Sequence, residues 1–439
     1  MMDVLATAPK YGLYKETGIE WLSEIPAEWN VEKAKWLFFK AERPVNKGDE
    51  IVTCFRDGQV TLRSKRRTEG FTNALKEHGY QGIRKGDLVI HAMDAFAGAI
   101  GISDSDGKST PVYAACVPRM PNIVNPSFYA YYMRDLALSG FIVSLAKGIR
   151  ERSTDFRFND FAQLPLPLPS LSVQDKIVSF LDTKTAQIDE AISIKQKQIV
   201  LLKERKQIII QKAVTQGLNP DVPMKDSGVD WIGQIPQHWK VEKLFGLCRF
   251  VRGNSAFAKD ELLSNGQYVA LQYGKTYKVD EIDESYEFYV NEEFYKETQV
   301  VSYGDVIFIS TSETIEDLGH SAIYNREEVG LTGGEQILIK PNNELLDHYY
   351  IYYSTKVFSK ELRKYATGIK VFRFNINDLK TIYTAFPPKE EQREIALHIS
   401  TQSKKIDETI SLQESQIEKL QEYKTTLINS AVTGKIKVA

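Results

Sequence analysis

The sequence contains little cysteine, and its three cysteines lie far apart. Cys54, Cys116 and Cys248 form no CxxC pair, and with six histidines they show no spacing typical of a zinc site. An odd, scattered set of thiols argues against a disulfide framework and predicts a reducing, cytoplasmic location. We therefore expect no structural metal in this chain.

The chain also lacks any apolar run approaching the roughly 18 residues that can span a bilayer. Its first residues, MMDVLATAPKYGLYKE, have no basic start followed by an apolar segment, so neither a signal peptide nor a membrane anchor is expected. An excess of one charge is missing too, because 56 basic and 58 acidic side chains give a net charge of −2. Any contact with a polyanion must therefore come from local basic patches.

The composition excludes the non-globular classes. Hydrophobic residues make up 42% and charged residues 26% of the 439 residues, which is typical of a folded protein rather than of a disordered chain. With 27 glycines and 16 prolines, the sequence is neither collagen-like nor mucin-like. The length predicts roughly two to four domains, at about 150 residues per domain.

Catalytic motifs are missing or incomplete. Adenine methyltransferases hold their target amine with Asp or Asn, Pro-Pro and an aromatic residue, and Phe386-Pro-Pro-Lys389 lacks both outer members. The segment Gly101–Ser109 has five residues between its glycines, where a phosphate-binding loop needs four. There is no HExxH and no GxSxG sequence. We expect no catalytic residue, and a chain that binds rather than catalyses.

Two halves of the chain begin alike. Gly18–Lys33 reads GIEWLSEIPAEWNVEK and Gly228–Lys243 reads GVDWIGQIPQHWKVEK, an offset of 210 residues from Gly18 to Gly228. The aligned pairs are Trp21 with Trp231, Pro26 with Pro236, and Trp29 with Trp239. Tryptophan is rare, so two aligned pairs next to Ile-Pro indicate an internal repeat.

The two halves also end alike. Gln174–Ile177 (QDKI) aligns with Gln392–Ile395 (QREI), an offset of 218 residues from Gln174 to Gln392. Further matches are IDE at 188–190 and 406–408, AVT at 213–215 and 431–433, KGDLVI at 85–90 with YGDVIF at 303–308, FRFN at 156–159 and 372–375, and GIR at 148–150 with GIK at 368–370. Similar ends and divergent middles indicate that the ends serve one purpose and the middles another.

The similar ends predict two long helices. Residues 172–216 and 389–434 contain no internal proline, and each segment follows a proline stretch, which is a helix-start signal. Apolar residues recur at steps of three, four and seven, the spacing of a coiled-coil seam. The predicted interface residues are Leu181, Ile188, Ile192, Ile199, Leu202 and Ile209 in the first helix, and Ile406, Ile410, Ile417, Leu420 and Leu427 in the second.

Polar seam positions match between the helices as well, because Thr185 aligns with Ser403, Lys195 with Gln413, and Lys206 with Lys424. Polar seam residues cost stability and fix the register. We favour an antiparallel pair within one chain. The alternatives are that each helix packs on its own domain, or that the helices form a homodimer.

The divergent middles, 18–165 and 228–385, predict mixed domains. Strands are expected at 87–90, 111–117, 305–309 and 336–340, where β-branched and apolar residues cluster. Helices are expected at the aromatic runs 127–132 and 348–353, whose tyrosines we interpret as core and boundary residues rather than base-stacking platforms.

Basic residues gather locally in both middles. Residues 56–67 carry a net charge of +4, whereas residues 279–297 carry eight acids and one lysine and should face away from any polyanion. Cations contact phosphates, and Arg, Lys, Asn and Gln read base edges. The candidate DNA-binding residues are Arg63, Lys65, Arg66, Arg67, Arg150, Arg152 and Arg157 in the first half, and Arg252, Gln272, Lys275, Lys370 and Arg373 in the second. For any one cluster, a solvated charged face is the alternative.

This doubled order of motifs resembles the specificity subunit of type I restriction–modification enzymes, over nearly the whole chain. The fold class expected is α/β (α+β), with two globular target-recognition domains separated by two long helices packed as an antiparallel coiled coil in a pseudo-twofold internal repeat. The expected domains are an N-terminal extension (1–17), target-recognition domain 1 (18–165), a central conserved spacer helix (166–217), target-recognition domain 2 with its linker (218–385, linker 218–227) and a C-terminal conserved spacer helix (386–439).

The resemblance implies that each domain reads one half of a split double-stranded DNA target. It also implies that the helices dock two modification subunits, which hold S-adenosylmethionine and methylate adenine, and that two restriction subunits join the complex. S-adenosylmethionine, ATP and Mg²⁺ are expected on those partners, with no cofactor and no membrane partner for this chain. The alternatives are a coiled-coil adaptor that binds only proteins, and, with little support in the sequence, a self-sufficient methyltransferase or nuclease.

Overall fold

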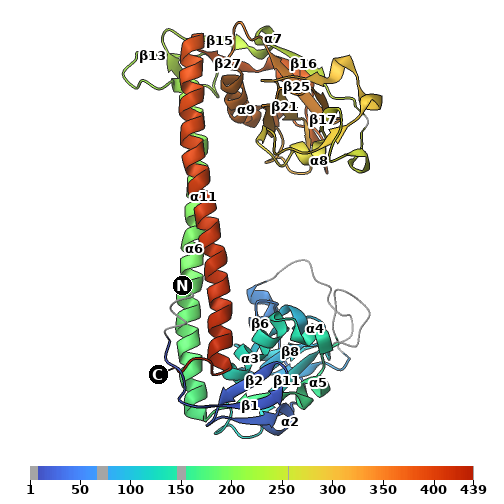
Figure 1. Cartoon of the computed structure of the whole chain (residues 1–439), viewed down its shortest axis with the longest axis vertical. Coiled ribbons are helices and arrows are strands. Elements are labelled where there is room, and N and C mark those ends of the chain that lie inside the picture. The colour runs from blue at the N-terminus through green and yellow to red at the C-terminus, as the bar shows by residue number, and fades with distance from the viewer. Residues whose placement is uncertain (1–7, 67–77, 146–154, 256, 439) are drawn as a thin grey trace. The chain divides into compact units, whose positions relative to one another are not determined.

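The computed structural model describes residues 8–66, 78–145, 155–255 and 257–438 (Figure 1). The chain divides into two compact units, one of residues 1–195 with 414–439 and one of residues 196–413. Each unit contains a globular domain together with a part of each long helix. The boundary between the two units falls inside the long helices. The domain boundaries predicted from the sequence fall instead at the ends of the helices, and they stay a prediction.

The globular part of the first unit is built on a four-stranded antiparallel sheet in the order β4 (Phe38–Lys40), β11 (Tyr113–Pro118), β8 (Leu88–His91) and β9 (Ile100–Ile102). Smaller ladders pair β1 (Tyr14–Ile19) with β2 (Leu22–Pro26), β3 (Asn30–Lys33) with β12 (Pro165–Leu168), β5 (Val52–Cys54) with β6 (Val60–Leu62), and β7 (Gln81–Ile83) with β10 (Gly107–Ser109). The helices are α2 (Ala34–Leu37), α3 (Pro126–Leu138), α4 (Phe141–Leu145) and α5 (Phe158–Gln163), with 3-10 turns η1 (Arg63–Lys65) and η2 (Ala95–Ala97).

The second unit carries more strand. One sheet has the order β16 (Cys248–Arg252), β25 (Gln336–Pro341), β21 (Val306–Ile309), β23 (Ser321–Tyr324) and β18 (Glu281–Ile282). A second has the order β19 (Tyr289–Val290), β17 (Tyr268–Leu271), β24 (Gly330–Thr332) and β20 (Val300–Val301). Smaller ladders pair β13 (Met224–Asp226) with β14 (Gln234–Pro236), β15 (Lys240–Lys243) with β27 (Tyr383–Phe386), and β22 (Thr311–Ser312) with β26 (Phe372–Arg373).

The helices of the second unit are α7 (Leu244–Leu247), α8 (Tyr273–Thr276), α9 (His348–Leu362) and α10 (Ile376–Thr381), with 3-10 turns η3 (Lys259–Glu261), η4 (Glu292–Phe294), η5 (Glu297–Gln299) and η6 (Arg363–Tyr365). The four predicted strands and both predicted aromatic helices are confirmed as β8, β11, β21, β25, α3 and α9. Tyr129, Tyr132 and Tyr350 are fully buried, as expected of core residues rather than of a surface that stacks on bases.

The predicted long helices are α6 (Leu171–Gln216) and α11 (Lys389–Val432). They pair antiparallel within each unit, because residue numbers rise along α6 where they fall along α11. In the first unit Lys195 bonds Gln416 and Lys424 bonds Asp189, and in the second unit Lys206 bonds Asp407. The intramolecular pair is therefore confirmed.

The predicted seam lies on the inner faces of the helices. Six predicted seam residues are buried, namely Leu181, Ile188, Ile199, Ile406, Ile410 and Leu427. The others, Ile192, Leu202, Ile209, Ile417 and Leu420, are half-buried. Near the end of α6, Ile210 is only 3% exposed and joins the core of the second globular domain, so the deepest contact there is one residue beyond the predicted Ile209.

A buried glutamine ties the start of each long helix to its own domain. Gln174 accepts a hydrogen bond from the Asn125 amide at 2.8 Å and donates to the carbonyls of Ile123 and Pro169, each at 2.9 Å. Asn125 caps α3, so this side chain fixes α6 against the helix that covers the sheet. The side chain is fully buried, which makes these three bonds costly to lose.

A glycine ends each long helix against the repeated tryptophan. Gly217 (φ 74°) follows α6, and a Cβ there would lie 3.1 Å from the indole of Trp239. Gly434 (φ 76°) follows α11 and stands in the same relation to Trp29. Both tryptophans are buried. The repeated Ile-Pro-x-x-Trp sequence therefore forms the socket that receives the C-terminal end of a long helix.

The repeat in the structure begins before Gly18. Tyr11 is buried and its ring packs on Trp29 with centroids 5.8 Å apart, and β1 starts at Tyr14. The Lys437 amide donates to the Pro9 carbonyl at 2.7 Å. The described part of the predicted extension thus belongs to the first unit, and β1–β2 corresponds to β13–β14 in the second.

Candidate nucleic-acid interface

Three of the candidate residues, Arg157 in the first unit and Arg252 and Arg373 in the second, lie near the ends of equivalent strands. After β8, the Ala92 carbonyl accepts a hydrogen bond from the Phe156 amide at 3.2 Å, and after β21 the Ser310 carbonyl accepts one from the Phe374 amide at 3.2 Å. The sequence match of the two FRFN segments pairs Phe156 with Phe372, whereas the structure pairs it with Phe374. The two FRFN segments are therefore two residues out of register. In each unit a buried phenylalanine, and not the arginine of the motif, bonds to the residue that follows the strand.

In the first domain, each described cation of the 56–67 cluster has a polar partner. Arg66 pairs with Asp57 at 2.6 Å and lies over the ring of Phe55. Lys65 donates to Ser105 at 2.9 Å, and Arg63 donates to Thr53 at 3.1 Å.

These contacts fix the positions of the cations, and the carboxylate partner of Arg66 reduces the positive potential that the cluster presents to an anion. The hydrogen bond from Arg66 lowers the pKa of the Asp57 carboxyl. The cluster is consequently a structured polar surface at η1 rather than a freely solvated +4 patch.

Arg157 lies at the N-cap of α5, close after the crossing at Phe156. Its side chain pairs with Asp155 at 2.7 Å and is 72% exposed, so it is available to an anion. The other first-half candidates, Arg67, Arg150 and Arg152, lie outside the residues that the structure describes.

Two arginines near the same strand end are not among the candidates. Arg56 pairs with Asp94, just after β8, at 2.8 Å. Arg134 of α3 reaches the carbonyl of Gly98 at 2.6 Å, and burial lowers the pKa of its guanidinium. Arg56 could have been chosen as a candidate, because it belongs to the basic cluster of residues 56–67. Arg134 lies on helix α3, and only the tertiary fold determines where its side chain points.

In the second domain, two of the candidates share a cavity. Arg252, at the end of β16, and Arg373, on β26, both line a pocket of about 420 Å³ together with Ser310, Thr311 and Glu335. Thr311 and Arg373 face each other across the β22–β26 ladder. This pocket includes Ser310, which follows β21 as Ala92 follows β8 in the first domain.

The remaining candidates of the second domain lie around this site rather than in it. Gln272 occupies the N-cap position of α8 without a side-chain cap hydrogen bond, and Lys275 of α8 lies over the ring of Phe288 at 4.2 Å. The neighbouring Tyr273 hydroxyl donates to the Thr311 carbonyl at 2.9 Å, which attaches α8 to β22. Lys370 is exposed in the turn before β26.

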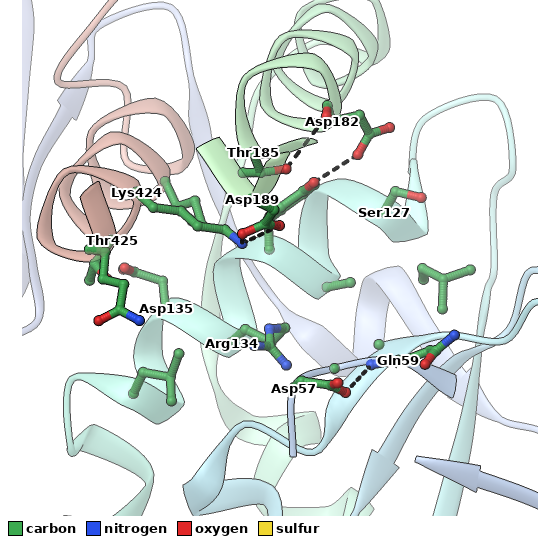
Figure 2. A pocket seen from close by; sticks show the side chains of 18 of the residues that line it. Asp57, Gln59, Ser127, Arg134, Asp135, Asp182, Thr185, Asp189, Lys424 and Thr425 are labelled. Carbon is green, nitrogen blue, oxygen red and sulfur yellow. Dashed lines mark hydrogen bonds and ion pairs between the residues drawn. The ribbon is translucent and has the colours of Figure 1, made fainter. Parts of the chain in front are cut away.

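A larger cavity of about 800 Å³ opens in the first unit between α3 and the helix pair (Figure 2). Asp57, Asp135, Asp182 and Asp189 line it together with Arg134 and Lys424. Burial raises the pKa of Asp135 at its wall. Acids outnumber cations here, so this cavity is not suited to a phosphate.

The described residues show no group of three or more side chains that could hold a metal ion. All three thiols are buried, and burial raises the pKa of Cys248 to about 12 and raises the pKa of Cys54 and Cys116 further. Within the described ranges, no helix is both long enough and apolar enough to cross a bilayer.

Residues 236–422 match the family model described as the Type I restriction modification DNA specificity domain. The type I restriction enzyme MjaVIII specificity subunit of Methanocaldococcus jannaschii is 25% identical over 328 residues, which cover 72% of each chain. A solved HsdS subunit from Thermoanaerobacter tengcongensis has a TM-score of 0.54 at 16% identity and covers 96% of this chain and 100% of that one. A chain solved for complex assembly and conformational transition of the type I R-M system has a TM-score of 0.70 at 15% identity, covering 93% and 98%.

The fold is a duplicated arrangement of mixed helix and strand, in which each unit contains a globular domain and parts of two long helices. The solved structures share this fold. Residues in the second half of the chain thus match the type I specificity family model, and the chain is similar to a type I specificity subunit, which is the family that its repeated motifs predict.

Proposed function

We propose that this chain is the non-catalytic, sequence-reading subunit of a type I restriction–modification system, and that it binds a bipartite double-stranded DNA target with one half-site for each globular domain. One observation carries the proposal. The two domains present different polar side chains at equivalent strand ends: Arg56 and Arg157 near the end of β8, and Arg252 and Arg373 near the end of β21. A common framework with different reading residues is what two unlike half-sites require.

We propose further that the helix pair docks two modification subunits, which are adenine-N6 methyltransferases, and that two restriction subunits complete the complex. Ile194 on α6 is 49% exposed and Leu412 on α11 is 57% exposed, and these residues are one repeat apart, 218 positions. Equivalent apolar positions suit two copies of the same partner. S-adenosylmethionine, ATP and Mg²⁺ then belong to the partners.

The experiment is a binding measurement on the complex of this chain with its modification subunits. Methylated adenines are first mapped in DNA from hosts with and without this chain, which gives the target. Duplexes with the mapped target and with a scrambled target are then compared across salt concentrations. We expect a preference for the target of 10³-fold or more, and affinity for both duplexes that falls steeply as salt rises.

Equal affinity for the two duplexes would favour the protein-binding adaptor instead. The triple variant R63E/K65E/R66E should weaken binding of DNA and leave assembly with the modification subunits unchanged. If the triple variant binds the target as tightly as the original chain does, Arg63, Lys65 and Arg66 do not contact the DNA.

A further inference from the structure

Glu335 stands out in the cavity of the second domain because it is an acid among residues proposed to meet a polyanion. It lies in the three-residue turn between β24 and β25, after Gly333 and Gly334. A carboxylate near phosphates is repelled, so its presence needs a reason. In the major groove a carboxylate can accept a hydrogen bond from a base amine, and the usual partner of Glu or Asp is the N4 amine of cytosine.

The backbone of Glu335 is strained. Its φ is 61°, and it is the one non-glycine residue with positive φ in the described parts of the chain. This conformation costs a residue with a Cβ about 1 kcal/mol or more, and glycine would adopt it freely. Two glycines immediately precede this position, and yet glutamate occupies it. Such strain persists where a particular side chain is needed.

The turn that carries Glu335 is tightly held. A Cβ on Gly253, next to Arg252, would lie 1.9 Å from the Gly333 carbonyl oxygen. A Cβ on Gly333 would lie 2.7 Å from the Leu271 carbonyl oxygen. The Ser310 hydroxyl donates to the Glu335 carbonyl at 3.3 Å. The backbone beneath the carboxylate is therefore fixed by contacts on several sides.

The carboxylate itself is oriented before any ligand binds. The buried Thr311 hydroxyl donates to Glu335 Oε2 at 2.7 Å. Arg373 Nη2 lies 3.9 Å from the same oxygen, and the two side chains are 61% and 49% exposed. Within the described ranges, no side chain or backbone group makes a hydrogen bond to the other oxygen, Oε1. An oriented acceptor and an exposed donor thus stand side by side, facing solvent.

We propose that Glu335 and Arg373 together read one G·C base pair in the half-site of the second domain, with Arg373 donating to guanine O6 and N7 and Glu335 accepting from cytosine N4. This assignment rests on the proposed function and names the residues that give part of its specificity. Guanine O6 and cytosine N4 are neighbours on the major-groove edge, so an adjacent donor and acceptor match that base pair. Only a G·C pair offers two adjacent acceptors followed by a donor, whereas an A·T pair has a single acceptor on each side of its donor.

The test uses the complex with modification subunits and maps the adenines that it methylates. E335Q keeps the shape and the bond from Thr311, and its amide can pair with adenine N6 and N7. We expect one position of the second half-site to lose its preference for cytosine by about 5- to 150-fold and to accept adenine, while the first half-site stays unchanged. R373A should weaken the preference for guanine at the same base pair. The matched control is E327Q, which changes an exposed glutamate outside the pocket and should leave the target intact.

A second variant separates reading from folding. E335G removes the backbone strain, so it should fold with a thermal midpoint equal to or above that of the original chain and still lose the cytosine preference. An unchanged target for E335Q or for E335G overturns the proposal. It is also overturned if R373A weakens all duplexes alike with a smaller salt dependence, because that result marks a phosphate contact. A complex of the original chain that shows no sequence preference contradicts the proposed function instead.

Discussion

Lys424 of α11 donates to both carboxylate oxygens of Asp189 on α6, each at 2.7 Å, inside the first unit. In the second unit Lys206 of α6 makes the same contact with Asp407 of α11, at 3.0 and 2.7 Å. Each residue of one pair lies 218 positions from its counterpart in the other. The repeat therefore extends to the contacts between the helices, with the roles of the two helices exchanged.

The first prediction concerns these ion pairs. They are partly exposed, with Lys206 at 21% and Asp407 at 53%, so each should contribute only about 0.2–1 kcal/mol. K206D places two acids opposite each other and should lower the free energy of unfolding by about that amount, and K206D/D407K should restore most of it. Urea unfolding of K206D, of D407K and of the double variant K206D/D407K gives the coupling energy between the two residues. K203D, on the exposed face of α6, is the control, and a coupling of zero would show that the contact is only geometric.

The second prediction concerns the buried glutamines. Gln392 repeats the bonds of Gln174, accepting from the Asp347 amide at 2.8 Å and donating to the carbonyls of Leu345 and Pro387. Q174L leaves one amide and two carbonyls without a partner, at about 1–3 kcal/mol for each buried group that water does not reach. We expect the free energy of unfolding to fall by at least 2 kcal/mol, measured by urea unfolding.

The matched control for Q174L is Q198L, at an exposed position of α6, which should change stability by no more than about 0.5 kcal/mol. Equal effects of the two variants would mean that the glutamine bonds contribute little. Q392L should act like Q174L on the second unit, since its bonds are the same.

The long helices can be predicted from the sequence almost to the residue, whereas the details of the candidate interface cannot. The start of α6 at Leu171 is set by local signals, a proline stretch and a heptad pattern, which the sequence displays directly. The positive φ of Glu335 belongs to a turn whose Gly333 packs against Gly253 and Leu271, which are 80 and 62 residues away from Gly333. The two-residue slip between the FRFN segments has the same origin, because a buried core contact outweighs a local match.

The third prediction concerns pH. Asp135 of α3 is buried and accepts a hydrogen bond from Asn429 at 2.7 Å, and burial raises the pKa of its carboxyl. A raised folded-state pKa means that the stability this group contributes is present below the ordinary aspartate pKa and is lost as pH rises through the folded-state pKa. D135N keeps an acceptor for Asn429 and carries no charge. It should therefore raise the thermal midpoint near pH 7 and have little effect near pH 3.

Thermal unfolding of the original chain and D135N between pH 3 and pH 8 measures this difference. D260N, at an exposed aspartate of the second unit, is the control and should show no such trend. If the difference between D135N and the original chain were the same at every pH, the effect would be one of packing and not of ionisation.

The fourth prediction concerns the gap between half-sites, and it rests on the proposed function. Because α6 and α11 are paired where Lys206 meets Asp407, a heptad inserted after Leu202 must be matched by a heptad in α11 after Ile410. Seven residues keep the seam in phase and add about 10 Å of helix, or about three base pairs at 3.4 Å each. We expect the preferred gap to lengthen by that amount while both half-site sequences stay the same, as read from mapped methylated adenines. A heptad in α6 alone mismatches the seam and should abolish methylation, whereas altered half-site sequences in the paired variant would show that the helices also take part in reading the DNA.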